Sequence, residues 1–421
     1  MDWRGFYPAR RWIMYKCGWY VVLLMTLACP AMPQSLAADE YLRIGLVRYF
    51  KGIKQATVLA TSDFTITRAG TSDVVGTCTN LEPAAFDFNS GQVLVKLING
   101  QKISVDGPVT VSPKDKGGFI TVDAPGRSSK LYRGSLEISA KNGALQLVSI
   151  ITLEDYLIGV LAGEMPAFFH AEALKAQAIA ARTYTIRGRN RHAADGYDLC
   201  DNVHCHVYDG AQRETPAYIR AVAATAGQIL TYKGQVASIM YASDCGGVTE
   251  CYSQDPKSAV PYLISVKEPE GLVHRTWEKT FTLDEISKKL MAAGVKEAEG
   301  LRSISIYKTT SSGRALLLTV CGAKGQNTVG GNSFRWAIGG SVIPSTLFTI
   351  ESCSGGKVTL KGKGFGHGIG MCQVGAGELA KPPFNYTCAQ ILAHYFPGTT
   401  LTTRSCLSQA KVAPPPDSES Q

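Results

Sequence analysis

The fold changes character at Thr152-Leu-Glu-Asp-Tyr-Leu-Ile-Gly-Val-Leu-Ala-Gly-Glu164-Met-Pro166, where the spacing of the apolar residues switches. Apolar side chains here recur three and four residues apart, as on one face of a helix. They are Leu153, Tyr156, Leu157, Val160 and Leu161. Thr152 and Asp155 have the spacing of a capping box, which predicts that the helix begins here. Gly163 and Pro166 predict that it is interrupted near Glu164.

Upstream of this stretch, residues 41–150 alternate between apolar and polar side chains in the two-residue period of strands. The segments 41–47, 92–97, 102–105 and 134–139 are examples. Gly, Asn, Asp and Pro separate them, as expected for tight turns between neighbouring strands. We therefore predict an antiparallel β-rich N-terminal region over residues 39–145.

Downstream, helical and strand patterns are mixed. An Ala-rich helix is predicted from about Pro166, a permitted first-turn residue, to Ile186, with Gly188 as its stop. Further helices are predicted over 212–226 and 283–293, and strands over 228–243, 302–322 and 346–361. The fold class is therefore α+β, with a mixed helix and sheet domain over 146–408. The proline-rich end, 409–421, is predicted to be disordered.

The N-terminus reads as an export segment. Arg10, Arg11 and Lys16 precede a short apolar run over 18–28, and small residues follow up to Ala38. This pattern predicts a secretory signal peptide or N-terminal anchor over residues 1–38 and a location in the periplasm or cell envelope. Membrane contact is expected only through this segment if it stays uncleaved. A twin-arginine signal at Arg10-Arg11 or a lipidated Cys29 stays open.

Charge and cysteine content limit the function classes. The formal net charge of +9 includes no block of Lys and Arg, so nucleic-acid binding is not indicated, whereas an anionic polymer is a compatible partner. Ten of the twelve cysteines lie beyond residue 38. In an exported protein they are expected first as disulfides, with a pairing that sequence alone leaves open.

Glu164 is the first candidate for chemistry. It lies at a helix break beside apolar residues that would partly desolvate it: Leu161, Met165, Phe168 and Phe169. Desolvation raises the pKa of a carboxyl group, which suits a general acid working near neutral pH. The alternative from spacing alone is that Glu164 caps the next helix, since a carboxylate is favoured at a helix N-terminus.

A second candidate is the cluster Cys200-Asp-Asn-Val-His204-Cys205-His206, with His192 upstream. These residues offer nitrogen and sulfur ligands for a tetrahedral zinc ion, provided that a turn points His204 and Cys205 to one place. A Cys200–Cys205 disulfide is the alternative. No H-E-x-x-H motif accompanies the cluster, which disfavours a metallopeptidase.

Two glycine-rich segments, 241–249 and 362–373, each follow a predicted strand. Glycine is needed where backbone approaches a ligand closely or takes a positive φ. We expect His367, which glycines flank, to be exposed at a rim. The plain alternative is a pair of tight turns. No G-K-[ST] ends either segment, so neither is a phosphate loop.

Taken together in order, the segments resemble the SpoIID/LytB family over roughly residues 41–402. The resemblance rests on Leu131-Tyr-Arg-Gly134, on 153–160 and Glu164-Met-Pro166, and on Glu172-Ala-Leu-Lys-Ala-Gln-Ala-Ile-Ala-Ala-Arg182-Thr-Tyr184. It continues through 227–230, 245–247, 261–263, 364–371 and 391–398. Cys372 departs from the family, in which serine is usual at this position, so a hydroxyl role there is in doubt.

The resemblance implies roles for particular residues. Glu164 would be the catalytic acid, with Arg182 in the same substrate cleft. The implied substrate-binding residues are Tyr241, Ser243, Gly246, Gly247 and His367. A structural zinc ion is implied at His192, Cys200, His204 and Cys205, without His206.

The activity implied by the resemblance is that of a peptidoglycan lytic transglycosylase, which cleaves peptide-stripped glycan strands between MurNAc and GlcNAc. The alternative is a non-catalytic wall-binding protein that stimulates a partner amidase. A zinc hydrolase centred on residues 200–206 is disfavoured, because the cluster offers neither a general base nor an open ligand position.

Overall fold

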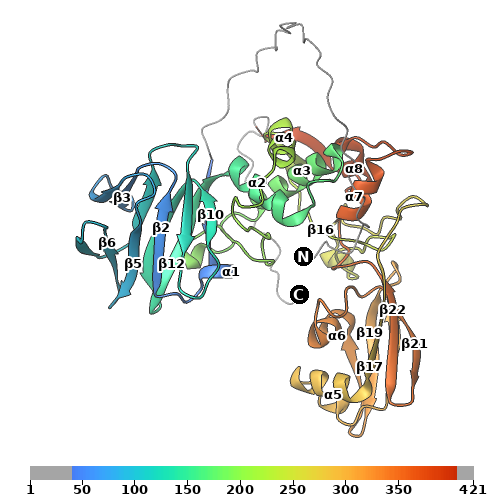
Figure 1. Cartoon of the computed structure of the whole chain (residues 1–421). Helices are drawn as coiled ribbons and strands as arrows, with labels where there is room; N and C mark the ends of the chain where they lie inside the picture. Colours follow the sequence, from blue (N-terminus) through green and yellow to red (C-terminus); the bar gives the residue numbers. More distant parts are fainter. Residues whose placement is uncertain (1–39, 405–421) are drawn as a thin grey trace, which may run out of the picture. The chain divides into compact units, whose positions relative to one another are not determined.

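The structure is a computed structural model that describes residues 40–404 (Figure 1). The predicted export segment, 1–38, and the predicted disordered tail, 409–421, lie outside the described residues. None of the helices between residues 40 and 404 has the length and apolar character needed to cross a membrane. The chain combines helices with several sheets, which agrees with the predicted α+β class.

The N-terminal region consists of two antiparallel sheets, as its alternating pattern predicts. In the first sheet the strand order is β13-β1-β12-β11-β8-β3-β4, and in the second it is β10-β9-β2-β5-β6-β7. β11 contacts β6 and β12 contacts β5, so the two sheets pack on each other with their apolar faces inward.

The elements of this region are β1 (Tyr41–Gly45), α1 (Val47–Phe50), β2 (Gln55–Ala60), β3 (Phe64–Arg68), β4 (Val74–Cys78), β5 (Ala84–Asn89), β6 (Gln92–Lys96), β7 (Lys102–Val105), β8 (Val109–Pro113), β9 (Phe119–Asp123), β10 (Lys130–Arg133), β11 (Ser135–Lys141) and β12 (Ala144–Thr152). β13 (Leu199–Cys200) adds to the edge of the first sheet and runs parallel to β1. This pairing carries Cys200 to the end of β1.

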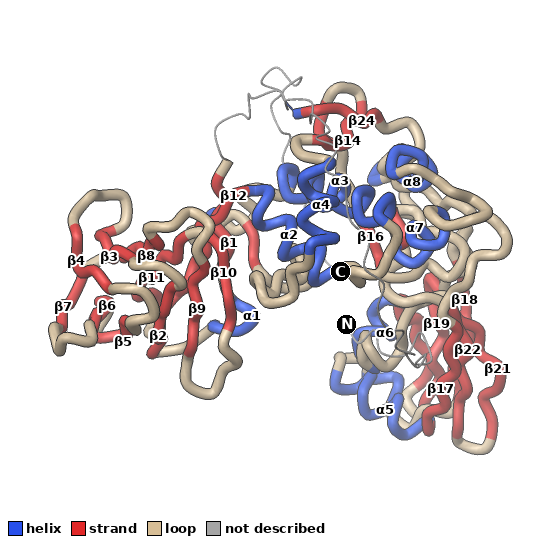
Figure 2. Tube along the Cα trace, turned by 45° about the horizontal axis from the view of Figure 1, so that its top comes forward, coloured by secondary structure: helices blue, strands red, loops and turns tan. Residues whose placement is uncertain are grey.

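The helical part is centred on α3 (Ala171–Arg187), which contacts α2 (Leu153–Glu164), α4 (Pro216–Ala224), α7 (Gln373–Leu379), α8 (Cys388–Tyr395) and β14 (Gln228–Tyr232). Figures 1 and 2 show α2, α3 and α4 side by side. The small Ala side chains of α3 permit this close packing, and most residues of α3 are buried.

The start of α2 is as predicted, because the Thr152 hydroxyl accepts a hydrogen bond from the backbone N–H of Asp155 at 3.2 Å. The predicted start of α3 is wrong. The helix begins after His170, whose ring accepts from the Glu172 N–H, and Pro166 stands in the preceding turn. α4 is also shorter than the predicted 212–226. Pro216, its first residue, lacks the N–H that would extend the helix backwards.

Two small sheets lie near these helices: β15-β14-β24, with β15 (Gln235–Val236) and β24 (Thr400–Thr403), and the parallel pair β16 (Tyr241–Ala242) and β23 (Met371–Cys372). The parallel pair joins chain positions about 130 residues apart, Tyr241 to Met371 and Ala242 to Cys372.

The segment between them contains a separate hydrophobic core. Its sheets have the orders β17-β22-β21 and β18-β19-β20. Figure 2 shows the labelled strands of this part beside α5 and α6. The elements are β17 (Thr276–Thr282), α5 (Leu283–Ala292), β18 (Ser303–Thr309), β19 (Ala315–Gly322), β20 (Gly325–Gly330), α6 (Gly331–Ile338), β21 (Phe348–Ser354) and β22 (Lys357–Lys363). The predicted helix over 283–293 and strands over 302–322 and 346–361 are thus found here. The pattern did not predict α6, α7 or α8, each of only seven or eight residues.

Candidate functional site

Glu164 is the last residue of α2 and is only 6% exposed. Its Oε1 accepts a hydrogen bond from the Val207 N–H at 3.0 Å, and its Oε2 accepts from Gln373 Nε2 at 3.4 Å. These partners come from a loop and from α7, and none comes from the start of α3. The helix-capping alternative for Glu164 is therefore not what the structure shows.

The approach of the 207 segment to Glu164 depends on two glycines of α2. A Cβ on Gly163 would stand 2.2 Å from the Val207 carbonyl oxygen, and one on Gly159 would stand 2.5 Å from the Tyr208 ring. Four residues apart, these glycines lie on one helix face, and their missing side chains let the loop pack directly against α2. The Val207 N–H reaches Glu164 because of this contact.

Burial raises the pKa of Glu164, and the hydrogen bonds from Val207 and Gln373 offset part of that rise. Leu161 and Met165 are buried beside it, as predicted. Phe168 is 66% exposed, so the expectation that it desolvates Glu164 is wrong. The direction of the shift is the one that a general acid near neutral pH requires.

Unpaired polar groups gather near this carboxyl group. Gln373 donates to both Glu164 and the Gln177 Oε1, at 3.4 Å each, which leaves Gln373 Oε1 and Gln177 Nε2 without partners. His206 Nε2 is also buried and unpaired, and the Tyr241 hydroxyl is buried beside the Gln177 side chain without a well-aligned hydrogen bond. Burying a polar group without a partner costs free energy. These groups are therefore candidates to form hydrogen bonds to a bound ligand.

Aromatic rings adjoin these groups. The His206 ring stacks on Tyr241 with centroids 6.0 Å apart and lies 4.6 Å from the Tyr184 ring. Its Nδ1 lies 3.1 Å from the Tyr156 hydroxyl. Burial lowers the pKa of His206 to about 3, so the ring is neutral at neutral pH. Burial, followed by the nearby Glu164 charge, raises the pKa of Tyr241.

The two glycine-rich segments meet through the β16–β23 pair and the Asp244–Phe365 and Glu250–Ile369 bridges. Their glycines are needed for this contact. A Cβ on Gly364 would stand 2.6 Å from the Asp244 carbonyl oxygen, and one on Gly370 would stand 2.1 Å from that of Met240. The space that these glycines leave is filled by the protein's own backbone, which favours the plain turn alternative for them.

Ser243, Gly246 and Gly247 lie in this paired region, where Ser243 accepts from the Val374 N–H through its carbonyl oxygen. A Cβ on Gly246 would meet the Leu347 side chain at 2.8 Å. His367 is half-buried rather than exposed at a rim, and its Nδ1 accepts from the Ile369 N–H. Burial lowers the pKa of His367 to about 4, so it too is neutral.

Arg182 makes all its described contacts away from Glu164. Its guanidinium forms a bidentate ion pair with Glu154, at 2.8 and 2.6 Å, and donates to the backbone carbonyls of Ala178, Val222 and Gln228. The side chain is fully buried. It joins α2, α3, α4 and β14, which is the arrangement of a structural arginine.

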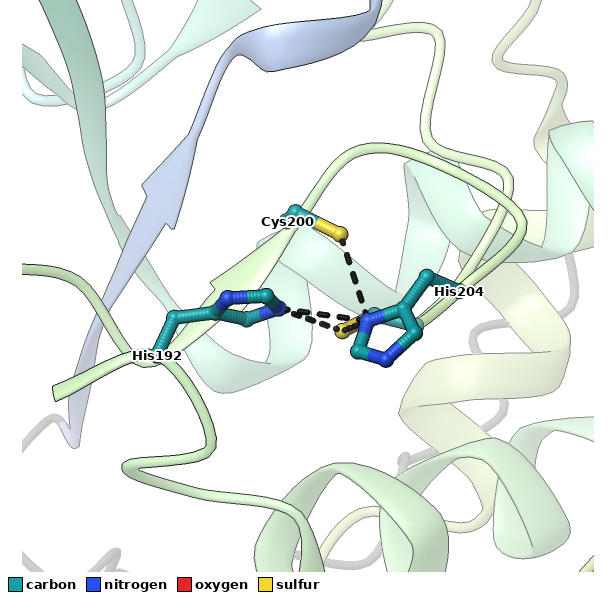
Figure 3. A group of neighbouring side chains, drawn as sticks. His192, Cys200 and His204 are labelled. Atoms are coloured by element: carbon teal, nitrogen blue, oxygen red, sulfur yellow. Dashed lines mark hydrogen bonds between the residues drawn. The ribbon is translucent and has the colours of Figure 1, made fainter. Parts of the chain in front are cut away.

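The four predicted zinc ligands converge, as Figure 3 shows for His192, Cys200 and His204. The two His nitrogens are 3.3 Å apart, Cys205 Sγ is 3.6 Å from each, and Cys200 Sγ is 3.9 Å from His204 Nδ1. Around a tetrahedral zinc ion, nitrogens stand about 3.3 Å apart and nitrogen and sulfur about 3.6 Å apart. The donor set therefore fits such an ion.

Local structure produces this convergence. The Cys205 N–H bonds to the Asn202 carbonyl at 2.9 Å, which forms the turn that the adjacent His204 and Cys205 require. His192 Nδ1 lies 3.2 Å from Asp195 Oδ2, so a carboxylate orients the ring and leaves Nε2 to face the cluster. His206 points instead to Tyr156 and Tyr241, in agreement with its omission from the predicted ligand set.

The nine cysteines among residues 40–404 are all free thiols, so the structure does not show the expected disulfides. Cys200 and Cys205 belong to the His192 cluster. The hydrogen bond from the Cys200 thiol lowers the pKa of Cys205 to about 7, which favours one thiolate in this pair.

Sequence reasoning missed Gln373, which bonds Glu164, Gln177, which bonds Gln373, and the rings of Tyr184 and His206 beside Tyr241. Gln177 and Tyr184 lie inside the quoted signature Glu172–Tyr184, and Gln373 ends the second glycine-rich segment. A buried glutamine in an Ala-rich helix is a detectable signal, because an amide in a core must find a partner.

Comparison with known proteins identifies the class to which this fold and site belong. Residues 141–232 match the SpoIID family, described as stage II sporulation protein, and residues 210–370 match a domain of unknown function, DUF8618. The stage II sporulation protein D of Bacillus subtilis is 34% identical over 305 residues, which cover 68% of this chain and 85% of that protein. The corresponding protein of Bacillus amyloliquefaciens is 30% identical, over 70% of this chain and 87% of its own.

The chain therefore belongs to the SpoIID/LytB family. The amidase enhancer of Bacillus subtilis is also similar, 31% identical over 59% of this chain and 40% of that longer protein. This membership supports a role related to the cell wall. It also confirms the resemblance on which the residue assignments rest.

Proposed function

We propose that this protein is an exported peptidoglycan lytic transglycosylase that acts in the cell envelope on glycan strands without stem peptides. The observation that carries the proposal is the environment of Glu164: a buried carboxyl group with a raised pKa, beside unpaired amide and hydroxyl groups that a ligand could satisfy. The substrate cleft around it is part of the proposal.

In the proposed reaction, protonated Glu164 donates its proton to the oxygen that links MurNAc C1 to GlcNAc. The C1–O bond breaks and an oxocarbenium-like centre develops at C1. The Glu164 carboxylate then takes the proton of the MurNAc C6 hydroxyl, whose oxygen bonds to C1 and closes a 1,6-anhydro ring. No water is consumed, so a single carboxyl group suffices where ordinary glycosidases use two.

The neighbours of Glu164 fit this cycle. The Val207 N–H and Gln373 amide stabilise the carboxylate formed after proton transfer, and burial stabilises the acid before it. Burial favours the neutral acid and the hydrogen bonds favour the carboxylate. Together they leave the two protonation states of Glu164 closer in free energy than one of these effects alone would. Tyr241 and His206, neutral and with unpaired atoms, are placed to bind sugar hydroxyl or N-acetyl groups.

A structural zinc ion at His192, Cys200, His204 and Cys205 belongs to the proposal. Four protein ligands leave no open position, so the ion would supply folding free energy and no chemistry. It would fix the turn that continues directly through His206 to Val207, the residue that binds Glu164. Arg191 also connects the zinc cluster with the aromatic rings beside Tyr241. It donates to the Tyr184 hydroxyl at 2.6 Å and lies 3.9 Å from Cys205 Sγ.

A non-catalytic enhancer of a cell-wall amidase is the second candidate. Its support is the similarity to the Bacillus subtilis amidase enhancer, which leaves the partner amidase open. A binding protein has no need of a buried carboxyl group among unpaired donors, so the environment of Glu164 favours the enzyme.

Mass spectrometry of products from peptide-free glycan strands tests the proposal. We expect 1,6-anhydroMurNAc ends from the unaltered chain and none from Glu164→Gln. Strand binding by both proteins with cleavage by neither would favour the enhancer. Cleavage retained in Glu164→Gln would reject this carboxyl group as the acid.

A further inference from the structure

A second group of metal-ligand side chains lies outside the His192 cluster and was not anticipated from the sequence. Cys245, Glu268, His274 and Cys372 place one donor atom each within 4.8 Å of one another. The two thiols and the carboxyl group are no more than 4% exposed, and the His274 side chain is 11% exposed. They come from three separate stretches of chain, so folding alone brings them together.

The imidazole of His274 is oriented as in metal sites. Asp244 accepts backbone N–H bonds from Gly246 at 2.8 Å and Arg275 at 2.7 Å, so its carboxylate is an acceptor. His274 Nδ1, 2.7 Å from Asp244 Oδ1, must therefore carry the proton. The other nitrogen, Nε2, is buried and lies 2.9 Å from Glu268 Oε2. A carboxylate on one nitrogen, with the second nitrogen facing the other donor atoms, is the usual arrangement of a ligating histidine.

The other donors are held in the same way. The Tyr395 hydroxyl donates to Glu268 Oε1, which leaves Oε2 to face Cys245 Sγ at 3.1 Å. Cys372 Sγ accepts the backbone N–H groups of Cys245 and Gly375, both at 3.2 Å. Such N–H donors stabilise a thiolate, the form in which cysteine binds metals. Every outer contact leaves one donor atom directed inward.

We propose that Cys245, Glu268, His274 and Cys372 form a second, closed zinc site. Two thiolates, an imidazole and a carboxylate suit this borderline-soft ion, and four protein ligands complete a tetrahedron. Tetrahedral zinc sets sulfur and oxygen about 3.6 Å apart and nitrogen and oxygen about 3.4 Å apart. The present separations, 3.1 and 2.9 Å, are shorter, so Glu268 moves outward by about half an ångström when the ion enters.

The proposed site lies where the two glycine-rich segments meet, next to Gln373. Cys245 belongs to the first glycine-rich segment and Cys372 to the second, so the ion clips the two segments together beyond the short β16–β23 pair. Gln373, next to Cys372, is the residue whose amide reaches Glu164. The second zinc ion is therefore a positioning device for Gln373, distinct from the His192 cluster, which supports Val207.

A proton can take the place of the ion. Burial lowers the pKa of His274, but hydrogen bonds to Asp244 and Glu268 outweigh this and raise it to about 10. A protonated His274 bridging two carboxylates is the metal-free alternative, and a Cys245–Cys372 disulfide is the oxidised one. With either alternative the only zinc ion would be the one at the His192 cluster. A count of one ion per chain would therefore indicate an alternative, and a count of two would indicate the proposed second site.

The test is elemental analysis of the chain as secreted, refilled with Zn²⁺ alone and freed of excess ion. We expect two zinc ions per chain, falling to one in His274→Gln and in Cys372→Ser. His192→Ala should also retain one, and Cys321→Ser, a cysteine outside both clusters, should keep two. One ion in the unaltered protein that only His192→Ala removes would overturn the proposal.

Cobalt titration of the unaltered chain covers the case in which the variants fail to fold. Two thiolate-containing sites predict sulfur-to-cobalt absorption that grows to two equivalents of Co²⁺. An end point at one equivalent, or a Cys245–Cys372 disulfide in the non-reducing peptide map, would overturn the second site. Neither readout requires glycan cleavage, so the result does not depend on the proposed catalytic activity, although the expected count of two rests on the zinc ion proposed at the His192 cluster.

Discussion

Glu164 and Arg182 are two buried ionisable residues on adjacent helices, and they differ in the hydrogen-bond and ion-pair partners that surround them. Arg182 has a carboxylate partner and three backbone acceptors. Glu164 has two neutral donors, and the polar atoms near it are partly unpaired. Removing one partner of a matched buried charge destabilises a fold strongly, whereas a buried carboxyl group without a charged partner has a raised pKa that suits acid chemistry.

The difference also bears on an inference from sequence, that Arg182 belongs to the substrate cleft, which stays a prediction. Glu164 and Arg182 belong to neighbouring signature segments, and the family resemblance implies one cleft for both. In the structure the arginine completes the contacts among α2, α3, α4 and β14, and the glutamate marks the proposed active site.

The largest expected effect is on cleavage by Glu164→Gln. Removal of the general acid should lower the rate of glycan cleavage by about 100-fold to 10,000-fold. The rate should be measured as anhydro ends formed per minute. Glu378→Gln, at a half-buried glutamate on α7, is the matched control and should cleave normally. Equal loss in both variants would point to a charge effect at large, not to Glu164.

The next effect is on stability, through Arg182→Met. Loss of the guanidinium removes the ion pair with Glu154 and the bonds to three carbonyl groups, but Glu154 is 37% exposed and can be solvated, so the free energy of unfolding should fall by about 2 kcal/mol. Denaturant titration measures this, with Arg220→Met on the exposed face of α4 as the control. If the folded fraction of Arg182→Met loses cleavage while its stability is unchanged, Arg182 acts on substrate and the contrast with Glu164 fails.

A smaller effect is the pH dependence of stability. The pKa of Glu164 is raised, so between the ordinary value of 4.5 and the raised value the folded chain keeps a proton that the unfolded chain has released. Stability therefore falls as pH rises through this window. Glu164→Gln should lack that fall and be more stable than the unaltered chain at neutral pH, by roughly 1 kcal/mol. Parallel stability profiles of the two proteins from pH 4 to 8 would contradict the raised pKa.

The smallest effect is expected from Tyr241→Phe. Its hydroxyl makes no well-aligned hydrogen bond in the folded protein, so stability should change little, whereas loss of one hydrogen bond to substrate, about 1 kcal/mol, should slow cleavage roughly fivefold. Tyr132→Phe removes an equally buried and unpaired hydroxyl from the N-terminal sheets and should leave cleavage unchanged. Identical behaviour of the two variants would remove Tyr241 from the site.

Local patterns predicted much of the fold. Alternation over 41–150 gave the strands, and Thr152 with Asp155 gave the start of α2, because both signals act between near neighbours. The start of α3 was missed because His170 caps it in place of Pro166. The short helices α6, α7 and α8 were missed because seven or eight residues carry too little periodicity against the many glycines around them.

The site was predictable only in part, for a related reason. His192, Cys200, His204 and Cys205 lie within fourteen residues, and their spacing limits where the side chains can go. Gln373, Cys245 and His274 reach their partners through tertiary contacts that no local pattern encodes. The domain boundaries at residues 38, 145 and 408 stay predictions.

The hydrogen bond from Gln373 to Glu164 closes a loop of 209 residues. A ribosome adds about 5–20 residues per second, so roughly 10–40 s separate the synthesis of the two ends of that contact. Loops of this length also close late in folding, since their entropy is lost before the contact repays it. Glu164 is therefore synthesised long before its amide partner. If it is the acid, as proposed, a nascent chain would hold it without the Gln373 bond, and the site would be complete only once α7 has folded.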